Sequence, residues 1–372
     1  TMEKFAGYGF NKCLVSSAEI VDARTGEKST VGSLFRERRP FTVHALGEDW
    51  KLRPRRVTDV VWNGRKPVFE LRTAQGKAIQ TTGNHPFRTL DGWKNLEALK
   101  PGDRIAAPRR LPVATTTTWP EYEIVTLAGL LSEGNTCHPT TLYFYGNDPA
   151  LVTDFAKAVS GFPDTVARIY SRGDGRLEVA ANLGRAGAAR EADAEYRVAC
   201  QGNLALVVDA PPRRCGAFQW AQRMGIIGRK ATEKRVPAEA FTLCDRDLEL
   251  FLGRLWAGDG FIHGRTNHVP FYATSSSGLA RDVQTLLLRL GILSGIHAKR
   301  FKYRGGTRPG YTVHLIGDGS LESFVQRVAP HAVGRQHQVE PLKQRLLSTR
   351  RGCASKDPTP EQVREWVREE KL

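Results

Sequence analysis

The sequence has 372 residues, enough for two or three domains of ordinary size. Hydrophobic residues make up 40% and charged residues 25%, so most of the chain can bury a core, and no apolar stretch is long enough to span a bilayer. The net charge of +16 is spread along the chain rather than held in one basic tail, which favours a polyanionic partner and no membrane. Six cysteines without a CxxC pair and no secretory leader lead us to expect a cytoplasmic protein.

The first twelve residues, TMEKFAGYGFNK, are too few to form a core of their own. Residues 13–112 are β-rich, with short alternating runs separated by turn signals such as Asn63-Gly64. We therefore expect a compact all-β domain over these residues. Its expected strands include Phe41–Ala45, Thr58–Trp62, Val68–Arg72 and Ala78–Thr82.

Residues 113–120 are rich in threonine and read as a linker. Beyond it, helical spacing alternates with strands, and one order of elements occurs twice. LAGLLSEG (Leu127–Gly134) resembles LGRLWAGDG (Leu252–Gly260), and each is followed by an aromatic strand and an amphipathic helix. This repeat predicts an α+β domain of two pseudo-symmetric lobes over residues 121–345. The charged tail, residues 346–372, is either a docking helix or a disordered end.

One candidate site combines a cysteine with a threonine and a histidine that follow much later. Cys13-Leu14-Val15 opens the β-rich region, and Thr81-Thr82-Gly83-Asn84-His85-Pro86-Phe87 stands near its end. Gly92-Trp93 and Leu99-Lys100-Pro101-Gly102-Asp103 come next. A cysteine or a histidine alone is more often an ordinary core or polar residue. Their order and spacing, together with the trailing motifs, resemble the N-terminal half of an intein, which has the all-β Hint fold.

The resemblance implies a role for each of these residues. Cys13 would attack the carbonyl of Lys12 and convert that peptide bond into a thioester, for which a thiolate is well suited. His85 would polarise or protonate the departing nitrogen, and Thr82 would form a hydrogen bond beside it. Splicing of this kind needs no cofactor.

The residues near the two ends bear on the host and on the C-terminal splicing block. GYGFNK resembles a stretch of the bacterial DNA polymerase III alpha subunit, so we interpret residues 1–12 as an N-extein remnant of that host. Inteins end with His-Asn before Cys, Ser or Thr, and no such block lies near Leu372. We expect that this chain alone does not complete splicing. A C-terminal intein and extein segment is then a partner, either truncated from this sequence or supplied in trans.

The repeated motif resembles that of the LAGLIDADG homing endonucleases, which are often inserted in inteins. Small residues in both motifs allow two helices to pack closely, so that Glu133 and Asp259 emerge side by side at the helix ends. Two such carboxylates can hold Mg²⁺ across two scissile phosphates. Glu133 replaces the commoner Asp. The small residues are Ala128, Gly129, Ser132, Gly253 and Ala257.

Two further features fit this resemblance. Lys234-Arg235-Val236-Pro237 is similar to the K-x-I-P block of the family, in which Lys234 would stabilise charge or activate water. Basic strands around two hairpins are expected to contact the major groove of double-stranded DNA. The expected DNA-binding residues are His297, Lys299, Arg300, Lys302, Arg304 and Arg308 in the second lobe, and Arg168 and Arg172 in the first.

Two functions follow from these patterns. The first is an intein fragment that starts splicing at Cys13 and carries an endonuclease that cuts both strands of the intein-less host gene with Mg²⁺. The second is a DNA-binding module whose nuclease activity has been lost. Magnesium-dependent nicking that disappears in Asp259→Ala separates the two. A third interpretation, a piece of polymerase, has no support after Lys12.

Overall fold

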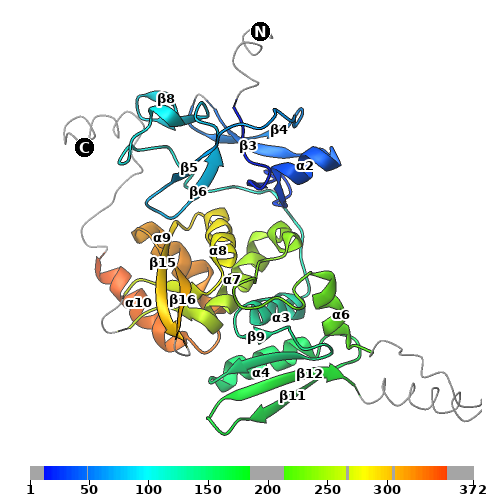
Figure 1. The fold of residues 1–372 in the computed structure, drawn as a ribbon. Coiled ribbons are helices and arrows are strands. Elements are labelled where there is room, and N and C mark those ends of the chain that lie inside the picture. The colour runs from blue at the N-terminus through cyan, green and yellow to red at the C-terminus, as the bar shows by residue number, and fades with distance from the viewer. Residues whose placement is uncertain (1–11, 48, 185–212, 265–267, 304–305, 350–372) are drawn as a thin grey trace, which may run out of the picture.

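The computed structural model describes residues 12–47, 49–184, 213–264, 268–303 and 306–349. Figure 1 shows a β-rich N-terminal part at the top of the view and two groups of helices and strands below it. Eleven of the twelve residues interpreted as the N-extein, and most of the predicted charged tail, lie outside the described residues.

The N-terminal part is built from short antiparallel hairpins that pair as β1-β2, β3-β4, β5-β6 and β7-β8. A helix, α2 (Val31–Glu37), and a 3-10 turn, η1 (Leu96–Ala98), also lie here. The sequence predicts an all-β domain, and the structure differs in containing these two helical elements. The helix begins where Thr30 Oγ1 accepts a hydrogen bond from Ser33 N, an N-cap. The strands are β1 (Glu19–Val21), β2 (Lys28–Thr30), β3 (Thr42–Leu46), β4 (Leu52–Arg56), β5 (Phe69–Arg72), β6 (Ala78–Thr81), β7 (Pro86–Thr89) and β8 (Gly92–Asn95).

Strands β3, β5 and β6 lie where alternation predicts them, within a residue or so of each expected end. The expected strand Thr58–Trp62 is wrong, because residues 57–68 contain no strand. Trp62 is 69% exposed, so its alternating run has no buried face to favour strand pairing. The arginine-rich β4 pairs with β3 instead, although its sequence lacks apolar alternation.

The C-terminal part repeats one order of elements twice. The first half runs α3, β9, β10, α4, β11, β12, and the second runs α7, β13, β14, α8, β15, β16. The two four-stranded sheets have the orders β9-β10-β12-β11 and β13-β14-β16-β15, which match position by position. The bounds are α3 (Glu121–Leu131), β9 (Gly134–Asn135), β10 (Leu142–Gly146), α4 (Pro149–Val159), β11 (Thr165–Ser171), β12 (Leu177–Leu183), α7 (Asp245–Asp259), β13 (Gly260–Phe261), β14 (Phe271–Thr274), α8 (Ser277–Arg289), β15 (Ser294–Tyr303) and β16 (Gly306–Leu315).

Helices α3 and α7 pack against each other at the centre of this part, and Figure 1 shows them between the two sheets. Their apolar residues are almost wholly buried in one continuous core. The remaining elements are α6 (Gly216–Arg223), η2 (Ala238–Thr242), α9 (Asp318–Arg327), η3 (Ala329–His331) and α10 (Gln336–Thr349). Helix α10 continues through residue 345, where the sequence places the end of the endonuclease domain.

The residues expected as a linker lie in fixed contact with the C-terminal part. Thr117 forms a parallel bridge with Leu243, and Trp119 N donates to Asp247 Oδ2 at 3.0 Å. Thr115 Oγ1 donates to Thr242 O at 2.6 Å. The connection is therefore held against the C-terminal part at Thr115, Thr117 and Trp119.

The turn between β5 and β6 touches the second sheet. Ile296 N on the edge strand β15 donates to Gln75 O at 3.0 Å, and Gln284 Nε2 on α8 donates to the same oxygen at 3.0 Å. Gly76 has φ +77°, and a Cβ there would lie 2.6 Å from Ile296 O, so the contact requires glycine. The β5–β6 hairpin thus contacts the second sheet at its turn, and its second strand, β6, ends at Thr81. No helix within the described ranges is long and apolar enough to cross a membrane.

Candidate functional site

The structure brings Cys13 and Thr82 into direct contact at the start of the β-rich part. Cys13 N donates to Thr82 Oγ1 at 3.0 Å. The Cys13 carbonyl oxygen accepts from Thr82 N at 3.1 Å and from Thr81 Oγ1 at 2.6 Å. Both hydroxyl groups belong to buried threonines at the end of β6, where Leu14 forms an isolated bridge with Thr81. The two peptide groups on either side of Cys13 are thereby each held by hydrogen bonds from the Thr81–Thr82 segment.

His85 lies one turn beyond Thr82, and its backbone N donates to Thr82 O at 3.0 Å. Its ring Nδ1 is buried and has no hydrogen-bond partner among the residues that the structure describes. Burial, and secondarily the positive charge of Lys12, lower the pKa of His85. The imidazole is therefore neutral at neutral pH and has a nitrogen available to take a proton.

Asn63 is a site residue that sequence reasoning missed. Its Nδ2 donates to Cys13 Sγ at 3.4 Å, so it holds the sulfur directly. The Asn63-Gly64 pair is an ordinary turn signal, and Gly64 does adopt φ +73°. That signal predicts the turn of the backbone at Gly64. It does not predict the contact with the Cys13 sulfur, because Cys13 lies fifty residues away in the chain.

The second candidate site lies where α3 and α7 end together. A glycine opens the short strand after each helix: Gly260 of β13 directly follows α7, and Gly134 of β9 follows α3 after the turn residues Ser132 and Glu133. A Cβ on either glycine would lie about 2.5 Å from backbone atoms of the residue four positions earlier. This match fixes the register, so that Glu133 and Asp259 occupy equivalent positions at the two helix ends.

The close approach of the two helix ends depends on Ser132 and Gly258. A Cβ on Gly258 would lie 2.5 Å from Ser132 Oγ. Two of the small residues expected to form this contact act elsewhere, which corrects the expectation. A Cβ on Gly129 would meet Phe155 of α4 at 2.3 Å, and one on Gly253 would meet His331 at 2.3 Å. These glycines seat flanking elements against the outer sides of the helices.

Lys234 lies at the same helix ends. It is only 8% exposed, and its Nζ donates to Ser132 O at 3.0 Å and to Gly134 O at 2.9 Å. These carbonyls flank Glu133 on both sides. Burial lowers the pKa of Lys234, while the charges of Asp259 and Glu133 oppose that shift.

The two carboxylates share one buried electrostatic environment. Burial, and then the negative charge of Glu133, raise the pKa of Asp259 to about 7, against the opposing effects of Lys234 and Arg335. Burial raises the pKa of Glu133 as well, with Lys234 opposing it. Arg335, which the sequence analysis did not single out, donates to Ala257 O at 3.2 Å and to Gly258 O at 3.1 Å. Two carboxyl groups thus lie close together in a buried site, where a bound cation would stabilise their ionised forms.

The donor set fits Mg²⁺. Magnesium is commonly held by one or two carboxylates, with water and substrate phosphate completing six oxygen ligands. Glu133 and Asp259 supply the carboxylates. The described ranges contain no group of three or more His, Cys, Asp or Glu side chains that could form an all-protein metal cage. The buried hydroxyl of Tyr272 also lacks a hydrogen-bond partner in the described part of the chain. Burial raises the pKa of this hydroxyl, and the negative charges of Asp259 and Glu133 raise it further.

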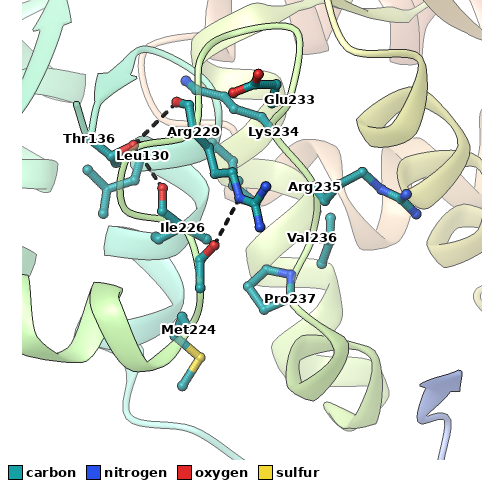
Figure 2. Close-up of a pocket in the computed structure, with 12 residues that line it drawn as sticks. Leu130, Thr136, Met224, Ile226, Arg229, Glu233, Lys234, Arg235, Val236 and Pro237 are labelled. Carbon is teal, nitrogen blue, oxygen red and sulfur yellow. Dashed lines mark hydrogen bonds between the residues drawn. The ribbon is translucent and has the colours of Figure 1, made fainter. Parts of the chain in front are cut away.

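A cavity of about 300 Å³ lies beside this site, between the end of α3 and the segment that carries Lys234. Figure 2 shows Thr136, Arg229 and Lys234 around it, and the side chain of Arg235 directed away from it. Thr136 Oγ1 donates to Ile226 O at 2.9 Å, which ties the strand after Glu133 to the loop on the far side of the cavity.

The basic hairpin of the second lobe places its cations on two faces. His297, Lys299 and Arg308 share the face opposite the buried Val313 and Leu315, since each side chain alternates along the paired strands. Arg300 and Lys302 lie on the other face, near the exposed end of the ribbon. Arg304 lies outside the described residues.

In the first lobe, Arg168 is exposed on β11, opposite Ala180. Arg172, just after that strand, forms a short ion pair with the buried Glu178. This contact already uses part of its donor capacity. One of the two arginines expected to bind DNA in the first ribbon is therefore ion-paired within the protein.

Both parts of the chain resemble known proteins. Residues 248–329 match the family model of the LAGLIDADG-like domain. The replicative DNA helicase DnaB of Rhodothermus marinus is 34% identical over 326 residues, which cover 86% of this chain and 32% of that protein. The protein RecA of Mycobacterium bovis is 29% identical over 293 residues, covering 77% of this chain and 33% of that protein. The solved structure of a DnaB intein from Synechocystis is 35% identical, covers 26% of this chain and 70% of its own, and has a TM-score of 0.25.

This chain spans about a third of the length of these two relatives, 32% and 33%. Two proteins with different names share this segment, and it makes up only part of each. An element inserted into different host proteins is expected to occur in this way. The LAGLIDADG-like match lies within that segment and follows, along the chain, the β-rich part that carries Cys13, Thr82 and His85. The chain is an intein that carries a LAGLIDADG-type endonuclease domain.

Proposed function

We propose that the β-rich part starts protein splicing at Cys13. The observation that supports this most directly is the contact of Thr82 Oγ1 with Cys13 N, the nitrogen of the bond to Lys12. In the proposed step the Cys13 sulfur attacks the Lys12 carbonyl carbon, the C–N bond breaks, and a thioester forms. The neutral His85 takes the thiol proton and delivers it to the departing nitrogen. Asn63 holds the sulfur, and Thr81 fixes the Cys13 carbonyl.

A further segment is proposed to complete this part of the molecule. Four of its large apolar residues are 53% to 69% exposed, more than a folded β domain usually leaves in water. We propose that a C-terminal intein segment, in cis or in trans, covers these apolar side chains. The exposed residues are Val61, Trp62, Phe69 and Trp93.

We also propose the DNA polymerase III alpha subunit as host.

Thr82→Val tests the splicing step. The variant keeps the shape of the side chain but cannot accept the hydrogen bond from Cys13 N. We expect thiol-induced cleavage before Cys13 to slow about tenfold, the equivalent of one hydrogen bond of roughly 1.4 kcal/mol. The exposed Thr58→Val is the matched control. Equal cleavage rates in the two variants would rule out this role of Thr82.

We propose that the endonuclease part cuts both strands of the intein-less host gene. The supporting observation is the equivalent placement of Glu133 and Asp259 at two packed helix ends, with Lys234 between the carbonyls around Glu133. Glu133 and Asp259 would hold Mg²⁺, which supplies Lewis-acid stabilisation of charge on the scissile phosphates. Lys234 stabilises the developing negative charge or orients the attacking water, whose oxygen bonds to phosphorus as the leaving P–O bond breaks.

The basic ribbons are proposed to hold the DNA on either side of these carboxylates. Their side chains suit phosphates and guanine edges of the major groove. The proposed contacts are His297, Lys299, Arg300, Lys302, Arg304 and Arg308, with Arg168 and Arg172 in the first lobe.

A plasmid that carries the uninterrupted host junction tests the nuclease. We expect the full chain with Mg²⁺ to nick and linearise it, and Asp259→Asn with the same DNA affinity to leave it supercoiled. Tight binding without cleavage by the wild-type chain would favour the second candidate, a DNA-binding module whose nuclease has decayed. The replacement of Asp by Glu133 is the observation that keeps this candidate open.

A further inference from the structure

A buried carboxylate outside the nuclease site joins the two parts of the molecule. Asp282 lies on α8 and is 1% exposed. Its Oδ1 accepts from Nζ of Lys28, on β2, at 2.5 Å. Arg235 donates to it twice, from Nε to Oδ2 at 2.7 Å and from Nη2 to Oδ1 at 2.8 Å. A carboxylate this deeply buried is tolerated only with such partners.

A second carboxylate balances the two cations. Glu19, on β1, accepts from Arg235 Nη2 at 2.5 Å and lies 3.7 Å from Lys28 Nζ. Lys28 Nζ also stands 4.5 Å from the ring centre of Phe241, in η2. Glu19, Lys28, Arg235 and Asp282 thus form an interface ion cluster with no net charge, to which the β-rich part and the endonuclease part each contribute one acid and one base.

The cluster holds the segment that carries Lys234. Figure 2 shows the side chains of Lys234 and Arg235 leaving this segment in opposite directions. Helix α8 and its N-cap residue Ser276 hold the backbone on both sides of Arg235, because Ser276 Oγ donates to Lys234 O at 2.7 Å and Val236 N donates to Asp282 Oδ2 at 3.0 Å. Gly278 makes room for Arg235, since a Cβ there would lie 2.2 Å from Arg235 Cδ.

We propose that the interface ion cluster positions Lys234, so that DNA cleavage depends on the docked splicing part. The inference rests on the proposed nuclease function. Without Lys28, the buried Asp282 keeps only Arg235 as a cationic partner, and the guanidinium reorients to compensate. The backbone from Lys234 to Val236 shifts with it. A displacement of about 1 Å at a catalytic group can slow a reaction by roughly 100-fold.

Lys28→Met in the full chain tests this role, with Lys94→Met as the matched control. Lys94 also belongs to the β-rich part and pairs with an exposed acid, Asp91, at 3.3 Å. We expect the single-turnover cleavage rate to fall about tenfold to 100-fold in Lys28→Met while the Kd for the same DNA is unchanged. Lys28→Arg restores the rate. A cleavage rate equal to that of Lys94→Met, or a loss confined to DNA affinity, overturns the proposal.

Amide hydrogen exchange supplies a readout that needs no cleavage. The N–H of Val236 is bonded to Asp282, so its exchange should accelerate at least tenfold in Lys28→Met relative to wild type and Lys94→Met. Gly278→Ala, whose added Cβ would lie 2.2 Å from Arg235 Cδ, should have the same effect. Unchanged protection in both variants overturns the positioning role. A wild-type chain that does not cleave DNA overturns the nuclease proposal instead, and the exchange result still decides whether the cluster holds this segment.

Discussion

Asp259→Asn should stabilise the metal-free protein at pH 8. The change keeps the size of the side chain but removes a charge from a buried site that also contains Glu133. The pKa of Asp259 rises from 3.8 to about 7, so its stabilising contribution is fully present below about pH 4 and is lost as the pH rises to about 7. At 1.36 kcal/mol per pKa unit, the wild-type chain loses about 4 kcal/mol at pH 8 and about 2 kcal/mol at pH 5.

The measurement is thermal unfolding in chelator at both pH values. For a unit of this size, about 4 kcal/mol corresponds to a rise in Tm of roughly 10 °C at pH 8, with a smaller rise at pH 5. Asp91→Asn, at an exposed turn, is the control and should change neither. Added Mg²⁺ should raise the Tm of the wild type and leave Asp259→Asn unchanged, because only the wild type keeps both carboxylates. An equal gain at both pH values, or no gain at pH 8, would refute this account of the site.

Three further changes test contacts described above. Gly76→Val places a Cβ against Ile296 O at a backbone φ of +77°, and calorimetry should show a loss of about 1–3 kcal/mol; wild-type stability would contradict the docking of the β5–β6 turn. Gly258→Val forces the two helix ends apart and should abolish DNA cleavage with the chain still folded, whereas retained cleavage would argue against close packing at this point. Replacing Lys299 and Arg308 together by Gln should weaken DNA binding and reduce the slope of log K against log salt by about two, and an unchanged slope would remove both from the interface.

The sequence predicts the endonuclease part better than the splicing part, for a physical reason. Its helices are long, periodic and duplicated, so one motif supports the other, and Glu133, Asp259 and Lys234 all lie at the same helix ends. The β-rich part consists of two-stranded hairpins whose pairing depends on distant segments. Alternation in the run that ends at Trp62 therefore predicts a strand that does not form.

Contacts between segments distant in the chain were the features that sequence reasoning missed. Asn63 reads as a turn residue and holds the Cys13 sulfur, and Arg335 has no motif around it yet reaches the carbonyls beside Asp259. Gly129 reads as a helix-contact residue but accommodates Phe155. A periodic pattern shows which face of a helix is buried, and it does not show which neighbour covers that face.

The most direct test of the account is the intact mass of the chain before and after incubation with a small thiol, beside Cys13→Ala. If Cys13 forms a thioester with Lys12, the thiol releases residues 1–12 from the wild type, and the mass falls by that peptide only when Cys13 is present. The same loss from Cys13→Ala, or an unchanged wild-type mass even after a matching C-terminal intein segment is added, would contradict the assignment of Cys13 as the residue that starts splicing.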